Sequence, residues 1–134
     1  MSKRTFIWFG LLVVVLAGVI PWLVFDGKGD AKKGAQEVPA HLETGQELFK
    51  IGCGNCHALY AAGTDGNYGP DLDLLLSPNG PAEGDAIKGV DGRVLNAIEN
   101  GVDSDAPGRM PGGILNEEQA KEVAAFVAAT AGSG

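Results

Sequence analysis

The chain has 134 residues, with 17 acidic against 10 basic residues, and a formal net charge of −7 at pH 7. Nucleic-acid-binding domains normally present a basic patch, and this sequence has none, so its composition argues against a nucleic-acid partner. The surplus of acidic residues fits either simple solubility or a docking partner with a positive surface. No strand pattern or internal repeat stands out, so helical structure is expected.

The first segment, residues 1–25, predicts a transmembrane anchor. Lys3 and Arg4 precede the run from Phe6 to Phe25, which is twenty residues without a charge. A helix of that length spans about 30 Å, the hydrocarbon thickness of a bilayer. A cleaved signal peptide is the alternative, but its apolar core is usually shorter and ends in small residues, whereas this run ends in bulky ones. Because basic residues stay inside, we expect a single-pass protein of the cell membrane, with a cytoplasmic N-terminus and the rest extracytoplasmic.

Residues 26–40 predict a flexible linker, because they are rich in Gly, Ala, Lys and Asp and lack an apolar face. Residues 41–134 then form the predicted domain, which is small for a self-sufficient core. Its first helix is expected where five residues recur at helical spacing, namely Leu42, Gly45, Leu48, Phe49 and Gly52.

The run Cys53-Gly54-Asn55-Cys56-His57 is the most informative motif of the chain. Cys-x-x-Cys-His is the attachment signature of a c-type haem. The two thiols can bond to the two vinyl groups of one haem, and the imidazole can reach the iron from one side. Because the chain has only these two cysteines, the motif predicts one covalent haem c, bound by Cys53 and Cys56 and ligated by His57.

Other interpretations of the motif stay open. A Cys-x-x-Cys pair can be a redox dithiol, although that usually accompanies a βαβ pattern, which is not evident here. Together with His41, the motif could supply four zinc ligands, but Cys56 and His57 are adjacent, which is unusual around one tetrahedral ion. A plain disulfide would leave His57 without a role.

Beyond the motif, Gly69-Pro70 is a turn signal, and the stretch from Ser77 to Gly89 is predicted to form an enlarged loop. A short helix is expected from Asp91 to Asn100, ended by Gly101.

Met110 is the candidate for the second axial ligand of the iron. It lies between Arg and Pro in a glycine-rich loop, whereas a methionine that fills a core gap would be expected in an apolar periodic segment. A thioether suits haem iron opposite histidine and raises the reduction potential. His41 is the rival ligand, but its polar approach to a helix is more typical of a solvated histidine.

The last helix is expected to start after Asn116, which can form a capping pair with Gln119. Acidic residues follow in the first turn, where they suit the helix dipole. The helix carries an apolar stripe made by Ala120, Val123, Ala124, Val127 and Ala128, with Phe126 beside it.

In their order, four motifs over about residues 40–130 resemble the small class I cytochromes c: Gly45-x-x-Leu48-Phe49, Cys53-x-x-Cys56-His57, Gly69-Pro70-Asp71-Leu72 and Met110-Pro111. The resemblance implies an all-α class I cytochrome c fold around one covalent haem, here preceded by the predicted transmembrane helix. It implies a close crossing of the first and last helices at Gly45, with Phe49 packed on Phe126. It also implies that the carbonyl of Pro70 accepts a hydrogen bond from His57 and so orients the ring.

The expected function is therefore that of a membrane-anchored one-electron carrier and not of an enzyme, because His57 and Met110 would fill both axial positions of the iron. The resemblance implies membrane-bound redox complexes as partners, with a quinol-oxidising complex as donor and a terminal oxidase as acceptor. One alternative is a fixed cytochrome c subunit of a larger respiratory or photosynthetic complex. Another is a gas sensor or peroxidase, which would need an open iron site.

Two tyrosines and one of two arginines are also expected at the haem. Tyr60 and Tyr68 would pack in the pocket, and Arg93 or Arg109 would pair with a propionate.

Overall fold

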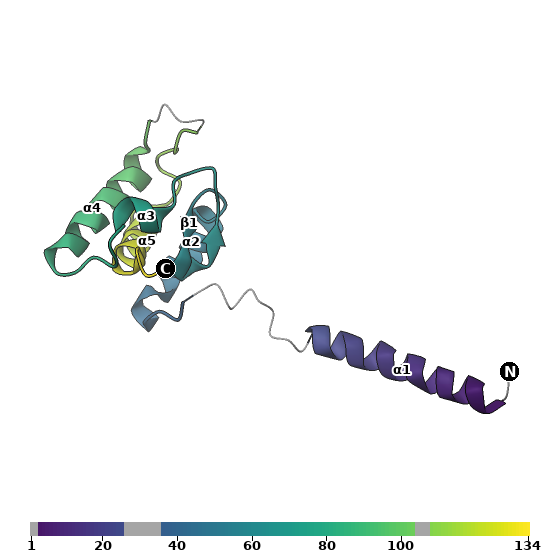
Figure 1. Ribbon diagram of the computed structural model, residues 1–134. Helices are drawn as coiled ribbons and strands as arrows, with labels where there is room; N and C mark the ends of the chain where they lie inside the picture. Colours follow the sequence, from purple (N-terminus) through teal and green to yellow (C-terminus); the bar gives the residue numbers. More distant parts are fainter. Residues whose placement is uncertain (1–2, 26–35, 104–107) are drawn as a thin grey trace. The chain divides into compact units, whose positions relative to one another are not determined.

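The computed structural model describes residues 3–25, 36–103 and 108–134. The chain divides into two units, Met1–Lys33 and Gly34–Gly134, which are described separately. The first unit contains α1 (Lys3–Phe25) (Figure 1). The second contains η2 (Ala40–Leu42), α2 (Glu43–Gly52), β1 (Ala58–Leu59), η3 (Tyr60–Ala62), β2 (Thr64–Asp65), α3 (Leu72–Leu76), α4 (Asp85–Asn100) and α5 (Glu117–Thr130).

The structure corrects the prediction of a transmembrane anchor. Helix α1 covers the expected segment, yet within the described residues no helix combines the length and the apolar character that a membrane span requires. The predicted transmembrane helix and the predicted single-pass localisation are therefore contradicted over this part of the chain.

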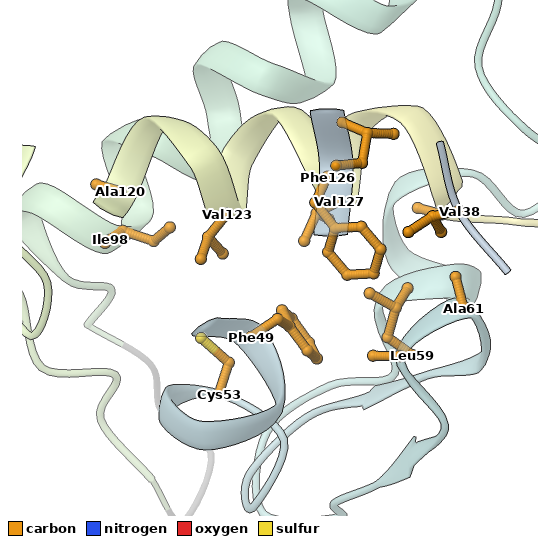
Figure 2. Close-up of a cluster of buried hydrophobic side chains, with 13 residues drawn as sticks. Val38, Phe49, Cys53, Leu59, Ala61, Ile98, Ala120, Val123, Phe126 and Val127 are labelled. Carbon is orange, nitrogen blue, oxygen red and sulfur yellow. The ribbon is translucent and has the colours of Figure 1, made fainter. Parts of the chain in front are cut away.

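The globular unit is mostly helical, with α5 packed against both α2 and α4. Because α5 lies against both partners, its stripe is almost fully buried: Ala120, Val123, Ala124, Phe126, Val127 and Ala128. Figure 2 shows Phe49 of α2, and Cys53 directly after this helix, on the side that faces Val123 and Val127 of α5. Helices α2 and α5 are thus packed together through the apolar core, which includes Cys53 of the cysteine motif.

The crossing of α2 and α5 depends on Gly45, as the resemblance implied. A methyl group at Gly45 would come within 2.7 Å of Cβ of Phe126 and 2.9 Å of the carbonyl carbon of Glu122. One turn further along, Phe49 and Phe126 pack edge to face, with ring centroids 6.0 Å apart. Glycine therefore allows a backbone approach that no side chain would permit, and the two rings fill the space beside it.

Two short strands interrupt the helical fold after the cysteine motif. β1 and β2 pair antiparallel, with Ala58 opposite Asp65 and Leu59 opposite Thr64. Between them η3 ends at Gly63, whose φ of 65° lies in the left-handed region that glycine adopts readily. Two-residue strands carry no periodicity that a sequence could reveal, which explains why none was expected.

Helix α4 starts at Asp85, six residues before the expected start at Asp91. The predicted loop from Ser77 to Gly89 therefore shrinks to the segment before Asp85. Gly89 and Gly92 concealed the first turns, because glycine is a poor helix former. The end is as expected, since Gly101 leaves the helix with a φ of 75°.

Hydrogen bonds hold the start of α5 and the N-terminal end of the globular unit. The expected capping pair is present: Gln119 N donates to Asn116 Oδ1 at 2.9 Å, and Asn116 N to Gln119 Oε1 at 3.2 Å. Residues 26–35 of the predicted linker lie outside the described residues. Its last residues contact the globular unit, since Val38 is buried and Gln36 N donates to Ala61 O at 3.2 Å.

Candidate cofactor site

The cysteine motif forms a tight turn at the end of α2. The amides of Cys53 and Gly54 both donate to Phe49 O at 2.8 Å, and the amides of Cys56 and His57 donate to Cys53 O at 3.0 and 2.9 Å. This winding separates the two sulfurs by environment, because Cys53 is buried against the core and Cys56 is exposed. Burial, and secondarily the charge of Cys56, raises the pKa of the Cys53 thiol to about 11.

His57 is held by the Gly69-Pro70 turn. Its Nδ1 lies 2.9 Å from Pro70 O, and because a carbonyl can only accept, Nδ1 carries the proton and donates. In the neutral ring this leaves the lone pair of Nε2 free to bind a metal. The turn itself is tied to the motif, since Gly69 N donates to Cys56 O at 2.7 Å.

Gly69 lies directly against the imidazole. A methyl group at this position would come within 2.7 Å of Nδ1 and 2.9 Å of Nε2 of His57. Ordinary van der Waals contact needs about 3.5–4.0 Å, so only glycine leaves the ring in place. The sequence alone marked Gly69 as a turn residue and gave no sign of this second role.

Met110 is placed by a bridge at the end of α4. Val102 N donates to Met110 O at 3.0 Å, and Met110 N donates back to Val102 O at 3.2 Å. Gly112 follows the backbone closely, because a methyl group there would lie 2.6 Å from the carbonyl carbon of Asn100. The glycines around Met110 therefore permit a close backbone contact that fixes the position of the methionine.

One cavity of about 1000 Å³ brings together all five predicted site residues: Cys53, Cys56, His57, Pro70 and Met110. This volume is at the upper end of the range for small-molecule and cofactor sites. Most of the lining is apolar, and it comes from α2, α3, α4 and α5 together with the segments that carry His57 and Met110. The chemistry of the donor set fits a haem, because two thiols, an imidazole with a free Nε2 and a thioether face one large apolar space.

The charged residues that line the cavity differ from those of the domain as a whole. Residues 34–134 contain 15 acidic and 5 basic residues, a net charge of −10. Among the described residues that line the cavity, the basic side chains are Arg93 and Arg109, and there is no Asp or Glu. Arg109 pairs with Asp103 at 2.9 Å, and both side chains are exposed. The domain is acidic, yet the charged side chains among the described lining residues are both basic. This charge favours a ligand that carries carboxylates.

Of the other residues that the sequence analysis proposed for the site, some line the cavity and others do not. His41 lies exposed on η2 and is not among the residues that line the cavity. No group of three or more His, Cys, Asp or Glu side chains that could hold a metal ion is found within the part of the chain that the structure describes. Tyr68 lines the cavity, whereas Tyr60 lines a separate surface hollow. Asn67 and Asn96 also line the cavity and carried no signal in the sequence.

Comparison with known proteins decides the family. The family model for cytochrome c matches residues 42–131, more than half of the chain. The chain belongs to the cytochrome c family. The crystal structure of the c-type cytochrome SorU from Sinorhizobium meliloti is similar, with 32% sequence identity and a TM-score of 0.52, over 69% of this chain and 92% of SorU. Among curated proteins, none matches the chain.

Membership in the family establishes the cofactor. Together with the similarity to a c-type cytochrome, it shows that this cytochrome carries a covalently bound haem c, as the motif predicted. It also indicates a haem-based electron carrier rather than an enzyme. The cavity fits this cofactor in size, apolar lining and donor set.

Proposed function

We propose that this cytochrome c carries single electrons, that Cys53 and Cys56 would attach the haem through thioethers, and that His57 and Met110 would ligate its iron. Bound haem supplies an iron centre that alternates between the ferrous and ferric states. The observation that carries the proposal is the orientation of His57, whose Nδ1–H is committed to Pro70 O while its Nε2 is free. With Met110 lining the same cavity, two protein ligands can occupy the iron and leave no position for a substrate.

Replacing Met110 with alanine tests the axial ligand. We expect the reduction potential to fall by on the order of 0.1 V, because a thioether stabilises the ferrous state. The reduced variant should bind carbon monoxide rapidly at neutral pH, whereas the reduced wild-type protein should not. Redox titration and carbon monoxide difference spectra measure the two effects.

His41→Ala is the matched control, because His41 is exposed outside the cavity and its removal should leave both properties unchanged. An unchanged potential in Met110→Ala, or rapid carbon monoxide binding by the wild-type protein, would remove Met110 from the ligand set.

For the partners, we propose a quinol-oxidising complex as electron donor and a terminal oxidase as acceptor. The resemblance to class I cytochromes c supports this pairing. The net charge of −10 over residues 34–134 favours a positive docking surface on each partner.

Electron transfer to such partners should slow as the ionic strength rises, because salt screens the attraction. A rate that is independent of salt would argue against positive docking surfaces.

Arg93 is proposed as the cation that offsets the haem carboxylates. It lines the cavity and, unlike Arg109, has no ion-pair partner among the described residues. We expect Arg93→Gln to lower the reduction potential by roughly a few tens of millivolts, because a lost positive charge favours the ferric state, and 59 mV is a tenfold change in a one-electron equilibrium.

Lys88→Gln is the charge-matched control for Arg93→Gln. Lys88 lies on the same helix, α4, but pairs with Asp85 at 3.0 Å and is not among the cavity-lining residues. Equal shifts of the potential in both variants would show a general charge effect and no specific role for Arg93.

A further inference from the structure

Asp73, in α3, accepts hydrogen bonds from two segments that lie far from it in the sequence. Its Oδ2 accepts from Tyr60 N, at the start of η3, and its Oδ1 accepts from Gly132 N, after the end of α5, both at 2.7 Å. Bonds of this length from amides to a carboxylate are charge-assisted, and they are roughly twice as strong as bonds between neutral groups. One carboxylate therefore joins η3, α3 and the residues that follow α5.

Helix α3 is too short to hold its own position. It has five residues, and isolated helices of that length are unstable in water, so other parts of the domain must keep it in place. The side chain of Asp71 caps the helix, but it accepts from Asp73 N and Leu74 N, within the first turn. Among the described residues, the hydrogen bonds that join α3 to other elements are the two that Asp73 accepts.

The bond from Tyr60 runs beside the bond that orients the imidazole. His57 Nδ1 donates to Pro70 O at 2.9 Å, and three residues further along both segments Tyr60 N donates to Asp73 Oδ2 at 2.7 Å. Residues 57–60 and 70–73 are thus joined at both ends, and the bond from Gly132 ties the second segment to the end of α5. The two bonds at Asp73 therefore oppose a movement of Pro70 O away from the ring.

The carboxylate acts from outside the haem cavity. The leucines of α3 that line the cavity are Leu72, Leu75 and Leu76, whereas Asp73 lines the separate surface hollow together with Tyr60. Asp73 can therefore influence the cofactor through the position of α3 and of the turn before it, without contact to the haem.

We propose that Asp73 is a positioning residue for the haem iron, because its bonds to Tyr60 N and Gly132 N hold the Pro70 carbonyl against His57 and thereby lower the reduction potential. A strong hydrogen bond at Nδ1 makes the imidazole a more basic ligand, which favours the ferric state. This inference rests on the proposed ligation by His57.

Solvent exchange of the His57 Nδ1 proton, followed by NMR in the ferrous holo-protein, tests this role. We expect exchange to be about tenfold faster in Asp73→Ala, because a carbonyl that is less restrained leaves the proton unbonded more often. Asp73→Asn should be intermediate, since its amide has one oxygen and retains one of the two bonds. Asp65→Asn is the matched control, because Asp65 is an exposed carboxylate on β2, and its exchange rate should equal that of the wild type.

The reduction potential provides a second readout. Asp73→Asn should favour reduction about threefold, which is roughly 28 mV at 59 mV for each tenfold change in a one-electron equilibrium. Asp65→Asn removes the same charge and should raise the potential clearly less. Gly45→Ala overpacks the crossing of α2 and α5, so it tests general loss of stability, and both the exchange rate and the potential should stay near those of the wild type.

A double-mutant cycle tests the bond from Gly132. Gly132 has a φ of 83°, and a methyl group there would lie 2.5 Å from Ser77 O and 2.8 Å from Ser77 Cβ, at the end of α3. Gly132→Ala should therefore displace Gly132 N from Asp73 and speed the exchange of the His57 proton. If both substitutions act through this bond, Asp73→Ala/Gly132→Ala should exchange at the rate of Asp73→Ala alone.

The inference would be overturned by an unchanged exchange rate in Asp73→Ala, by full additivity in the cycle, or by equal effects of Asp73→Asn and either control. In each case, chemical shifts typical of an iron-bound imidazole for His57 in the wild-type protein would leave the proposed ligation intact. Absence of those shifts in the wild-type protein would reject ligation by His57 and, with it, the role of Asp73.

Discussion

Replacing Gly69 with alanine should disrupt the histidine side of the haem site. The added carbon would lie 2.7 and 2.9 Å from the two ring nitrogens of His57, so the imidazole would have to move by about 1 Å to reach ordinary contact. That movement would also break the hydrogen bond to Pro70 O. We expect the free energy of unfolding of the holo-protein to fall by roughly 2–4 kcal/mol, combining overpacking with a lost hydrogen bond.

Denaturant unfolding and the fraction of purified chain that carries haem, measured by mass spectrometry, report the effect. Gly92→Ala is the control, because a methyl group there meets nothing within 4 Å. Pro70→Ala should be mild, since the acceptor is a backbone carbonyl that alanine retains. If Gly69→Ala retained the stability and spectrum of the wild-type protein, the packing of Gly69 on His57 would be wrong.

The second large effect is expected at the crossing of α2 and α5. Two influences on Gly45→Ala have opposite signs. Alanine is a better helix former by about 1 kcal/mol, whereas overpacking a helix crossing costs roughly 1–3 kcal/mol or more. Because the methyl group would lie 2.7 Å from Cβ of Phe126 and closer still to the carbonyl oxygen of Glu122, overpacking should prevail. We expect the free energy of unfolding to fall by about 1–3 kcal/mol.

Gly89→Ala measures the opposing influence alone. Gly89 lies in α4, is exposed, and has nothing within 4 Å of an added methyl group. This variant should gain about 0.5–1 kcal/mol in the same denaturant titration, because the unfolded chain loses freedom. A gain of similar size in Gly45→Ala would mean that the two helices do not approach as closely as described.

The parts of the site that are contiguous in sequence were the most predictable. The run from Cys53 to His57 carries its chemistry in local spacing, because both thiols and the imidazole must reach one cofactor from a single turn. The capping pair of Asn116 and Gln119 is local in the same sense. The apolar run before Phe25 was also a local pattern, and there the inference to a membrane span was contradicted.

The amino-acid sequence by itself determined the covalent attachment chemistry, the helical character of the domain and the order of the motifs, because each depends on residues within a few positions of one another. Only the tertiary structure decided that Gly69 lies on the imidazole and that Arg93 lines a cavity without Asp or Glu among its described lining residues. The physical reason is distance along the chain. Gly45 and Phe126 are 81 positions apart, and contact between such residues is set by how the helices pack and not by any local pattern.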